Sequence, residues 1–184
     1  MLKINEIFYS LQGEGANTGM PVIFIRFAGC NLKCSWCDTR HQSFKELDEV
    51  TIIKYLQLFL PCKRIIFTGG EPTLQNYNLL VKSLNKLGYW LGIETNGTSN
   101  RKKLENFDWV TISPKNKDIK LEYCDELKVV WTGKEDLKWF EGITAKHYFL
   151  QPCSMKNIPA TIRKVKMNPK WRLSLQCQKL LNIK

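Results

Sequence analysis

The chain has 184 residues, enough for one domain with a sizeable hydrophobic core and too few for two comfortable ones. Its 43% hydrophobic and 11% aromatic content is typical of a folded globular protein and excludes a disordered or fibrous one. Charges interrupt every short window of the N-terminal segment, so it is not a signal peptide, and no apolar run approaches the roughly 18 residues that span a membrane. We therefore expect a single domain, residues 1–184, in the cytoplasm, where thiols stay reduced.

The formal net charge of +11 raises nucleic acid as a partner. The basic residues, however, are spread along the chain, and the densest group, Lys115, Lys117 and Lys120, is interrupted by Asp118. We predict a solvated basic surface without direct nucleic-acid binding. Such a surface also suits anionic small molecules or an acidic protein partner.

Short apolar runs rich in Val, Ile, Phe and Trp alternate with helical patterns along the chain. In the second helical pattern, Leu79, Leu80, Leu84 and Leu87 form an apolar stripe, and Gly88 ends the helix. This alternation predicts βαβ units and a mostly parallel sheet in one α/β domain. The predicted strands are 22–28, 64–68, 89–94, 109–113, 127–131, 147–151 and 171–175, and the predicted helices are 50–60, 75–87, 134–140 and 158–167.

The chemically unusual residues follow these strands directly. The segments AGCNLKC, TGGEP, TNG, SPK and QPC each begin where an apolar run ends. Because the carboxyl ends of parallel strands share one face of the sheet, these five loops are expected to converge on one site.

Three of the seven cysteines, Cys30, Cys34 and Cys37, have the spacing C-x3-C-x2-C. Thiolates at such spacing bind zinc or an iron–sulfur cluster. A structural zinc site needs four closed ligands, and His41 could complete one. Three thiolates on one tight loop more naturally hold three irons of a 4Fe–4S cluster and leave the fourth iron open. The other four cysteines stand singly among apolar neighbours, which is typical of small core residues: Cys62, Cys124, Cys153 and Cys177.

The cysteine motif with Trp36 before its last cysteine, followed by a strand that ends in GGEP, resembles the radical S-adenosylmethionine (SAM) superfamily. This resemblance implies that SAM chelates the open iron through its amine and carboxylate. One electron from the cluster then cleaves the sulfonium and releases a 5′-deoxyadenosyl radical. The protein's task in such chemistry is to orient the cofactors and to exclude water.

Within the superfamily, SLQGEG, FIRFAGCNLKCSWCDT, TGGEP, IETNG, SPK and WRLSLQ resemble the 7-carboxy-7-deazaguanine synthase family over nearly the whole chain. The resemblance implies magnesium-dependent conversion of 6-carboxy-5,6,7,8-tetrahydropterin to 7-carboxy-7-deazaguanine and ammonia, on the route to queuosine. It also implies a homodimer and a flavodoxin-like or ferredoxin electron donor. The expected fold is a reduced, open radical SAM barrel of the partial (β/α)6 type, with fewer helices than a full barrel.

The same resemblance assigns residues to ligands. Arg26 lies inside an apolar strand, where an unpaired charge is costly, and a grip on the substrate carboxylate would explain it. A buried ion pair between Arg26 and Glu14 is the alternative. The implied substrate contacts are Leu11, Gln12, Gly13, Arg26, Thr68, Gln178 and Lys184; the implied SAM contacts are Ser35, Trp36, Cys37, Gly69, Gly70, Glu94, Thr95, Ser113, Pro114, Lys115, Gln151 and Pro152; the implied magnesium ligand is Thr39.

Two features depart from the family pattern. Gln178 stands where the family usually has a histidine, and an amide can exchange hydrogen bonds but carries no proton. His41 follows the cluster loop and His147 begins a strand, so neither is expected to replace it. The chain is also short for the family, and Lys184 is included because a terminal carboxylate reaches the substrate in some members.

Two other functions remain open at this stage. A glycyl-radical-enzyme activase of the same superfamily shares the short chain and the cysteine spacing, although QGEG and CDT argue against it. A zinc-stabilised basic module that binds nucleic acid is the alternative from a different class.

Overall fold

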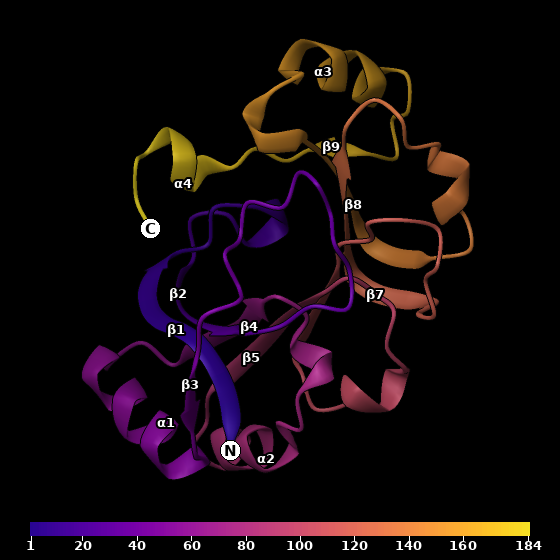
Figure 1. The fold of residues 1–184 in the computed structure, drawn as a ribbon. Coiled ribbons are helices and arrows are strands. Elements are labelled where there is room, and N and C mark those ends of the chain that lie inside the picture. The colour runs from indigo at the N-terminus through magenta and orange to yellow at the C-terminus, as the bar shows by residue number, and fades with distance from the viewer.

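Nine strands form one sheet in the computed structural model, which describes residues 1–184 (Figure 1). Its strand order is β3-β1-β2-β4-β5-β6-β7-β8-β9, and the two end strands do not pair with each other, so the sheet is open. The strands are β1 (Leu2–Leu11), β2 (Pro21–Phe27), β3 (Lys45–Leu47), β4 (Arg64–Gly69), β5 (Trp90–Thr95), β6 (Trp109–Ile112), β7 (Tyr123–Trp131), β8 (Thr144–Pro152) and β9 (Arg172–Leu173); the helices are α1 (Glu49–Leu56), α2 (Asn78–Lys86), α3 (Ile158–Lys166) and α4 (Cys177–Leu180).

Six neighbouring strands, β2 and β4 to β8, run parallel to one another, and the two-residue β9 continues them. The prediction of an open, partial α/β barrel is therefore confirmed. Only α1, α2 and α3 accompany the parallel strands, because the connections after β5, β6 and β7 contain no α-helix.

The two faces of the parallel strands have different side chains. On the outer face, Ile25, Phe67 and Ile93 are aligned across β2, β4 and β5 and are almost fully buried in the main core. On the inner face, the register aligns Arg26 with Thr68 at the carboxyl ends of the first two of these strands. Successive side chains of a strand alternate between the two faces of the sheet. The same strands therefore supply apolar side chains to the core on the outer face and polar side chains to the inside of the open barrel.

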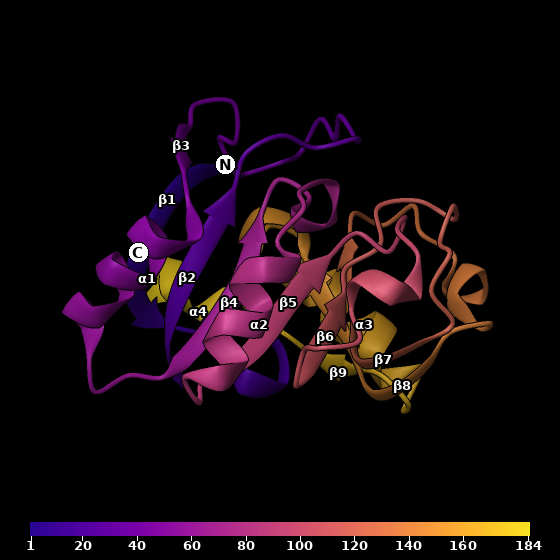
Figure 2. The same ribbon diagram turned by 90° about the horizontal axis from the view of Figure 1, so that it is seen from below.

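Helices α1 and α2 lie side by side along one side of the sheet (Figures 1 and 2). Asp48 caps α1 by accepting a hydrogen bond of 2.7 Å from the amide of Thr51. Gly88 ends α2 with a positive φ of 73°, as predicted. The predicted stripe of α2 is wrong in part: Leu79 and Leu87 are exposed, and the buried face consists of Leu80, Val81 and Leu84.

Several predicted bounds change in the structure. The predicted helix 134–140 is only a short 3-10 segment, Leu137–Phe140, and the predicted strand 171–175 shrinks to β9. Two strands were not predicted, β1 and β3, which pair antiparallel at one edge of the sheet. The mixture of charges in β1 hides its alternation, because this strand lies next to the edge of the sheet. None of the helices combines the length and apolar character that crossing a bilayer requires.

Candidate active site

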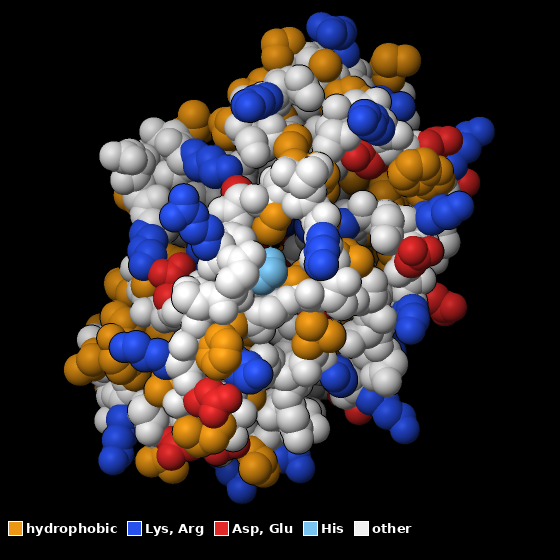
Figure 3. Space-filling view, in the orientation of Figure 1, with side chains coloured by type: hydrophobic (Ala, Val, Ile, Leu, Met, Phe, Trp, Pro, Cys, Tyr) orange, Lys and Arg blue, Asp and Glu red, His pale blue; other side chains and the backbone are white.

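A cavity of about 1200 Å³ opens at the carboxyl ends of the parallel strands. Its walls include the segments that follow β1, β2, β4, β5, β6 and β8, together with the C-terminal residues. Figure 3 shows this face hollowed near its centre, with Lys and Arg side chains scattered around it. The predicted convergence of loops is therefore confirmed, and of the predicted site residues all line the cavity except Ser35, Pro114 and Pro152.

The cysteine loop, residues 28–44, crosses in front of the sheet in Figure 1 and projects away from it in Figure 2. Cys30, Cys34 and Cys37 all line the cavity, and all three are free thiols. Burial raises the pKa of Cys34, and the charges of Cys37 and Cys30 add to this, whereas Lys115 opposes it. No three Cys, His, Asp or Glu side chains are drawn together around a single metal position.

The segment Gly69-Gly70-Glu71 fastens the cysteine loop to the sheet. The amide of Glu71 donates to the carbonyl of Gly29 over 2.8 Å, and a Cβ atom on Gly70 would overlap that same carbonyl. The Glu71 carboxylate is fully buried and accepts bonds of 2.7 Å from the Thr95 hydroxyl and from the amide of Asn96. This structural role of Glu71 and Thr95 was not predicted, and it holds the ends of β4 and β5 in register beneath the cysteines.

A second anchor joins the cysteine loop to the segment after β5. The side chain of Asn96 donates to Asn31 over 2.9 Å, and Asn31 donates to the hydroxyl of Thr98 over 2.9 Å. Because Asn31 immediately follows Cys30, this chain of amides fixes the beginning of the cysteine motif. The asparagine of IETNG therefore has a positioning role that sequence reasoning did not assign.

Trp36 and Lys115 form one wall of the cavity. The Lys115 ammonium lies 5.5 Å from the centre of the Trp36 ring and 2.7 Å from the hydroxyl of Ser113. Burial lowers the pKa of Lys115, and the positive charge of Lys128 lowers it further. The loop that the sequence predicted as solvated thus begins with a partly buried cation in the cavity wall, while Lys117 and Lys120 are exposed as expected.

Polar side chains of the inner face form a connected network in the same cavity. The Glu94 carboxylate accepts hydrogen bonds of 3.0 Å from both the Gln12 amide and the Thr68 hydroxyl. It also lies 3.4 Å from the ammonium of Lys128, whose shorter ion pair, 2.7 Å, is with Glu14. The structure therefore groups Glu94 with Gln12 and Thr68, two predicted substrate contacts, although the sequence analysis assigned Glu94 to SAM.

The C-terminal segment closes over the Gly-rich loop that follows β1. Both Gln176 and Gln178 donate to the Glu14 carboxylate over 3.0 Å, and the Cys177 amide donates to the carbonyl of Gly13 over 2.9 Å. The Oε1 atom of Gln178 is buried against Gly13 and has no hydrogen-bond partner.

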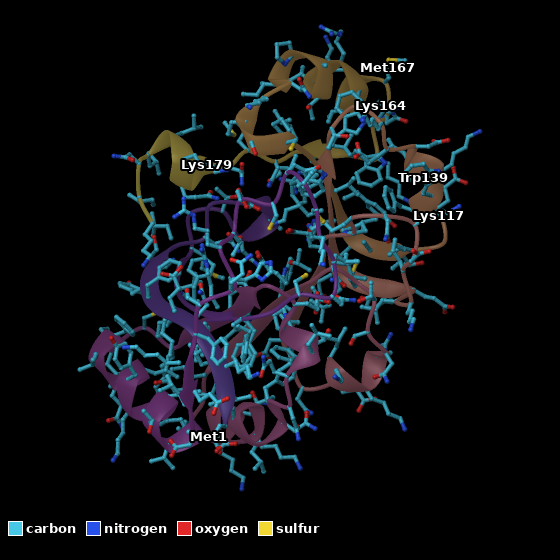
Figure 4. The ribbon with its side chains drawn as sticks, viewed as in Figure 1. Met1, Lys117, Trp139, Lys164, Met167 and Lys179 are labelled. Atoms are coloured by element: carbon cyan, nitrogen blue, oxygen red, sulfur yellow. The ribbon has the colours of Figure 1, made fainter.

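This C-terminal segment also reaches the cysteine loop. Asp38, directly after Cys37, accepts bonds of 2.6 Å from Lys179 and 3.1 Å from Gln176. Figure 4 shows Lys179 on α4 beside the N-terminal ribbon, whereas Lys117 and Trp139 lie at the opposite edge of the molecule. Asp38 and Lys179 are 141 positions apart, and neither the residue types nor the hydrophobic spacing of the sequence indicates that they are in contact.

Arg26 forms its ion pair with Glu6 and not with Glu14. Its guanidinium lies 3.1 Å from the Glu6 carboxylate and over the ring of Phe8 at 5.1 Å, so the alternative of an ion pair with Glu14 is wrong. Lys184 binds the other oxygen of Glu6 at 2.5 Å and lies 4.8 Å from the same ring. Arg26 and Lys184 thus flank one corner of the cavity, as two cations that share a single carboxylate.

His41 lines the cavity, with a buried Nδ1 atom that has no hydrogen-bond partner. His41 thus belongs to the site region, whereas His147 stacks on Trp109 at 5.8 Å and is not part of the cavity. That neither histidine replaces the imidazole expected at position 178 stays a prediction. Thr39 lines the cavity and is only partly buried.

Residues 24–116 match the Radical SAM superfamily, so the match contains the cysteine loop, the GGEP segment and Lys115. Over the whole chain, 50% of residues are identical to the 7-carboxy-7-deazaguanine synthase of Bacteroides thetaiotaomicron, which is also covered completely. The enzyme of that name from Haemophilus influenzae is 38% identical over 98% of this chain and 93% of its own length. A crystal structure of QueE from Escherichia coli superposes with a TM-score of 0.74 at 26% identity, covering 96% of this chain and 94% of that one.

An open parallel barrel with three cysteines on the loop after its first parallel strand defines a radical SAM protein, and the chain belongs to that superfamily. This membership implies a 4Fe–4S cluster and SAM as cofactors. The full-length relatives then place it more narrowly. The chain belongs to the 7-carboxy-7-deazaguanine synthase family, and it is an enzyme, a radical SAM lyase.

Proposed function

We propose that the chain converts 6-carboxy-5,6,7,8-tetrahydropterin to 7-carboxy-7-deazaguanine and ammonia, on the route to queuosine. The observation that carries the proposal is that one cavity contains both the three thiols and a network of polar side chains. This network, called the polar wall below, consists of amides and carboxylates from Gln12, Glu14, Glu94 and Gln178. A polar heterocycle bound in this cavity would find hydrogen-bond partners in the network and would share the same space with the cofactors.

The residues fit the two implied cofactors. The donor set is three soft thiols on one loop without a fourth protein ligand, which suits a 4Fe–4S cluster with one open iron. Gly69 and Gly70 leave bare backbone in the cavity wall, and Lys115 supplies a partly buried positive charge that can face the SAM carboxylate. When bound, these cofactors supply a single electron and an organic radical, and the protein contributes orientation and exclusion of water.

Magnesium belongs to the proposal as well. Thr39 offers one hydroxyl at the end of the cysteine loop, and a single hydroxyl is a weak ligand set. Substrate oxygens and water would therefore complete the octahedral shell. Omitting magnesium from the assay is expected to reduce turnover of the wild-type protein and to have little effect on Thr39→Ala.

The decisive experiment is anaerobic incubation of the reconstituted protein with SAM, magnesium, dithionite and 6-carboxytetrahydropterin, with the products identified by mass. We expect 7-carboxy-7-deazaguanine and ammonia, in the absence of any protein substrate. A protein that cleaves SAM but leaves the pterin unchanged would contradict the proposed substrate and favour the glycyl-radical-enzyme activase. An isolated protein that contains zinc and no iron would instead favour the basic nucleic-acid module.

Two partners complete the proposal. Electrons would come from a flavodoxin-like or ferredoxin donor, and the active form would be a homodimer. Light scattering on the purified protein tests the second point directly, since a mass near 21.5 kDa would contradict it and a mass near twice that value would support it.

A further inference from the structure

The most unusual side chain that the proposed chemistry leaves without a task is Lys128. It lies in the middle of β7, only 3% of its side chain is exposed, and it faces the cavity rather than the core. A lone buried ammonium is very costly, so its partners must compensate it. Those partners are Glu14, at 2.7 Å, and Glu94, at 3.4 Å, from two other elements of the fold.

We infer that Lys128 is a positioning residue for substrate binding, which holds Glu14 and Glu94 side by side as ionised hydrogen-bond acceptors on the polar wall of the cavity. The inference rests on the proposed function and adds a residue to it. The pyrimidine edge of a pterin carries an amino group and a ring N–H, both donors, and an ionised carboxylate is an acceptor only. Two carboxylates fixed by one buried cation therefore form a receptor for such an edge.

The hydrogen bonds around the pair support this role. Gln176 and Gln178 both donate to one oxygen of Glu14, and Gln12 and Thr68 donate to separate oxygens of Glu94. These donors come from β4, the N-terminal loop and the C-terminal segment, so the two carboxylates join three of the segments to which substrate contacts were assigned; Arg26 on β2 lies outside this network. Lys128 is the one cation bound to both.

These contacts determine the charge states of Glu14 and Lys128. Burial alone would raise the pKa of Glu14, but the charge of Lys128 and hydrogen bonds from Lys128, Gln176 and Gln178 lower it to about 2. Burial also disfavours the Lys128 ammonium, yet Glu14, then Glu94 and Glu126, raise its pKa above the ordinary value. Two further charges act on the pair: Asp38 near Glu14, and Lys115, whose pKa Lys128 lowers.

The test compares Lys128→Arg and Lys128→Met with the double variant Lys128→Met/Glu14→Gln. Lys146→Met is the matched control, because Lys146 is an exposed lysine that pairs with Asp125 on the neighbouring strand, outside the cavity. Melting temperature, cluster content and binding of SAM are measured for each variant, together with equilibrium binding and KM of the pterin. We expect Lys128→Met to weaken pterin binding by roughly tenfold or more, the loss of a charge-assisted contact, while SAM binding changes less than about twofold.

The double variant separates positioning from mere charge compensation. It removes Lys128 together with its shorter ion-pair partner and leaves Glu94 with its hydrogen bonds from Gln12 and Thr68, so it is expected to recover part of the melting temperature lost in Lys128→Met but to keep the weak pterin binding. Lys128→Arg is expected to recover part of the affinity, because it retains the charge. Wild-type pterin affinity in the double variant would overturn the inference and reduce Lys128 to a structural counter-ion.

A readout without substrate keeps this test apart from that of the proposed function. Carbon-13 NMR of labelled glutamate follows the ionisation of Glu14 directly. In the wild-type protein Glu14 is expected to stay ionised down to about pH 2, whereas in Lys128→Met the charge and hydrogen bond of Lys128 no longer oppose burial, so the Glu14 pKa rises although Gln176 and Gln178 still donate to it. Unchanged titration of Glu14 would overturn the inference, whichever substrate the enzyme uses, whereas failure of the wild-type protein to convert the pterin would overturn only the proposed function.

Discussion

Gly13 and Gln178 interlock: the Gln178 side chain occupies the space where a Cβ atom on residue 13 would lie. The two residues belong to opposite ends of the chain, and the Cys177 amide adds a 2.9 Å hydrogen bond to the Gly13 carbonyl. Gly13 is buried and has an ordinary φ, so the requirement for glycine arises from this contact and not from backbone strain. The glycine therefore allows the loop after β1 and the C-terminal segment to pack closely against each other beside the cavity.

The first prediction follows from this contact. Gly13→Ala is expected to displace Gln178 and raise the KM for the pterin several-fold, with cluster content and SAM binding unchanged. Gly142→Ala is the matched control, because a Cβ atom there meets nothing within 4 Å and φ is ordinary. Equal kinetic constants for Gly13→Ala and the control would show that the C-terminal segment is not part of the substrate wall.

The second prediction concerns the cluster. Replacing Cys30, Cys34 or Cys37 with Ala is expected to abolish iron loading and turnover, because each removes one of three ligands that no other residue replaces. Cys62→Ala is the control, since Cys62 packs against the core and is not in the cavity. A full cluster in the Cys34→Ala protein, measured by iron content and visible absorbance, would contradict the assignment.

Much of this site is predictable from sequence. Cysteines, glycines and polar residues directly follow the apolar runs, and the residues that follow parallel strands meet at the same edge of the sheet. What the sequence analysis missed are contacts between distant segments, such as those of Lys128 with Glu14, 114 positions apart. A signal for Lys128 did exist: it is a charge within the apolar run 127–131, the same feature that drew attention to Arg26. β1 and β3 gave a weaker signal, since strands at an edge of the sheet need no continuous apolar run.

The third prediction concerns Arg26. If its guanidinium grips the substrate carboxylate, Arg26→Lys should weaken pterin binding by about 1.5–3 kcal/mol, because an ammonium cannot form the bidentate fork. Glu6 at 3.1 Å holds the guanidinium in place, so Glu6→Gln is expected to give a smaller loss in the same direction. Binding measured by calorimetry should show SAM affinity unaffected. Similar losses for pterin and SAM would mean that Arg26 supports the fold of the cavity as a whole.

The fourth prediction concerns the electron donor. A net charge of +11 would attract an acidic donor protein and accelerate its association at low salt. Turnover driven by a flavodoxin-like protein should therefore fall as ionic strength rises from about 0.01 to 0.15 M, where screening shortens from about 30 to 8 Å. Turnover driven by dithionite is the control and should change far less. The same salt dependence with both reductants would remove the steering effect.

The last prediction concerns Gln178, at the position where the sequence resemblance implies a histidine. Its amide donates to Glu14 over 3.0 Å, while its Oε1 atom is buried against Gly13. Gln178→Leu should raise the KM of the pterin roughly tenfold, because the Glu14 carboxylate loses a donor that orients it. Gln178→His should preserve turnover and add a pH dependence that the wild-type protein lacks. The Glu14 carboxylate favours the imidazolium, so the new transition should lie above the ordinary histidine pKa of about 6.5. A pH–rate profile of Gln178→His that superposes on that of the wild-type protein would show that residue 178 does not touch the reacting pterin.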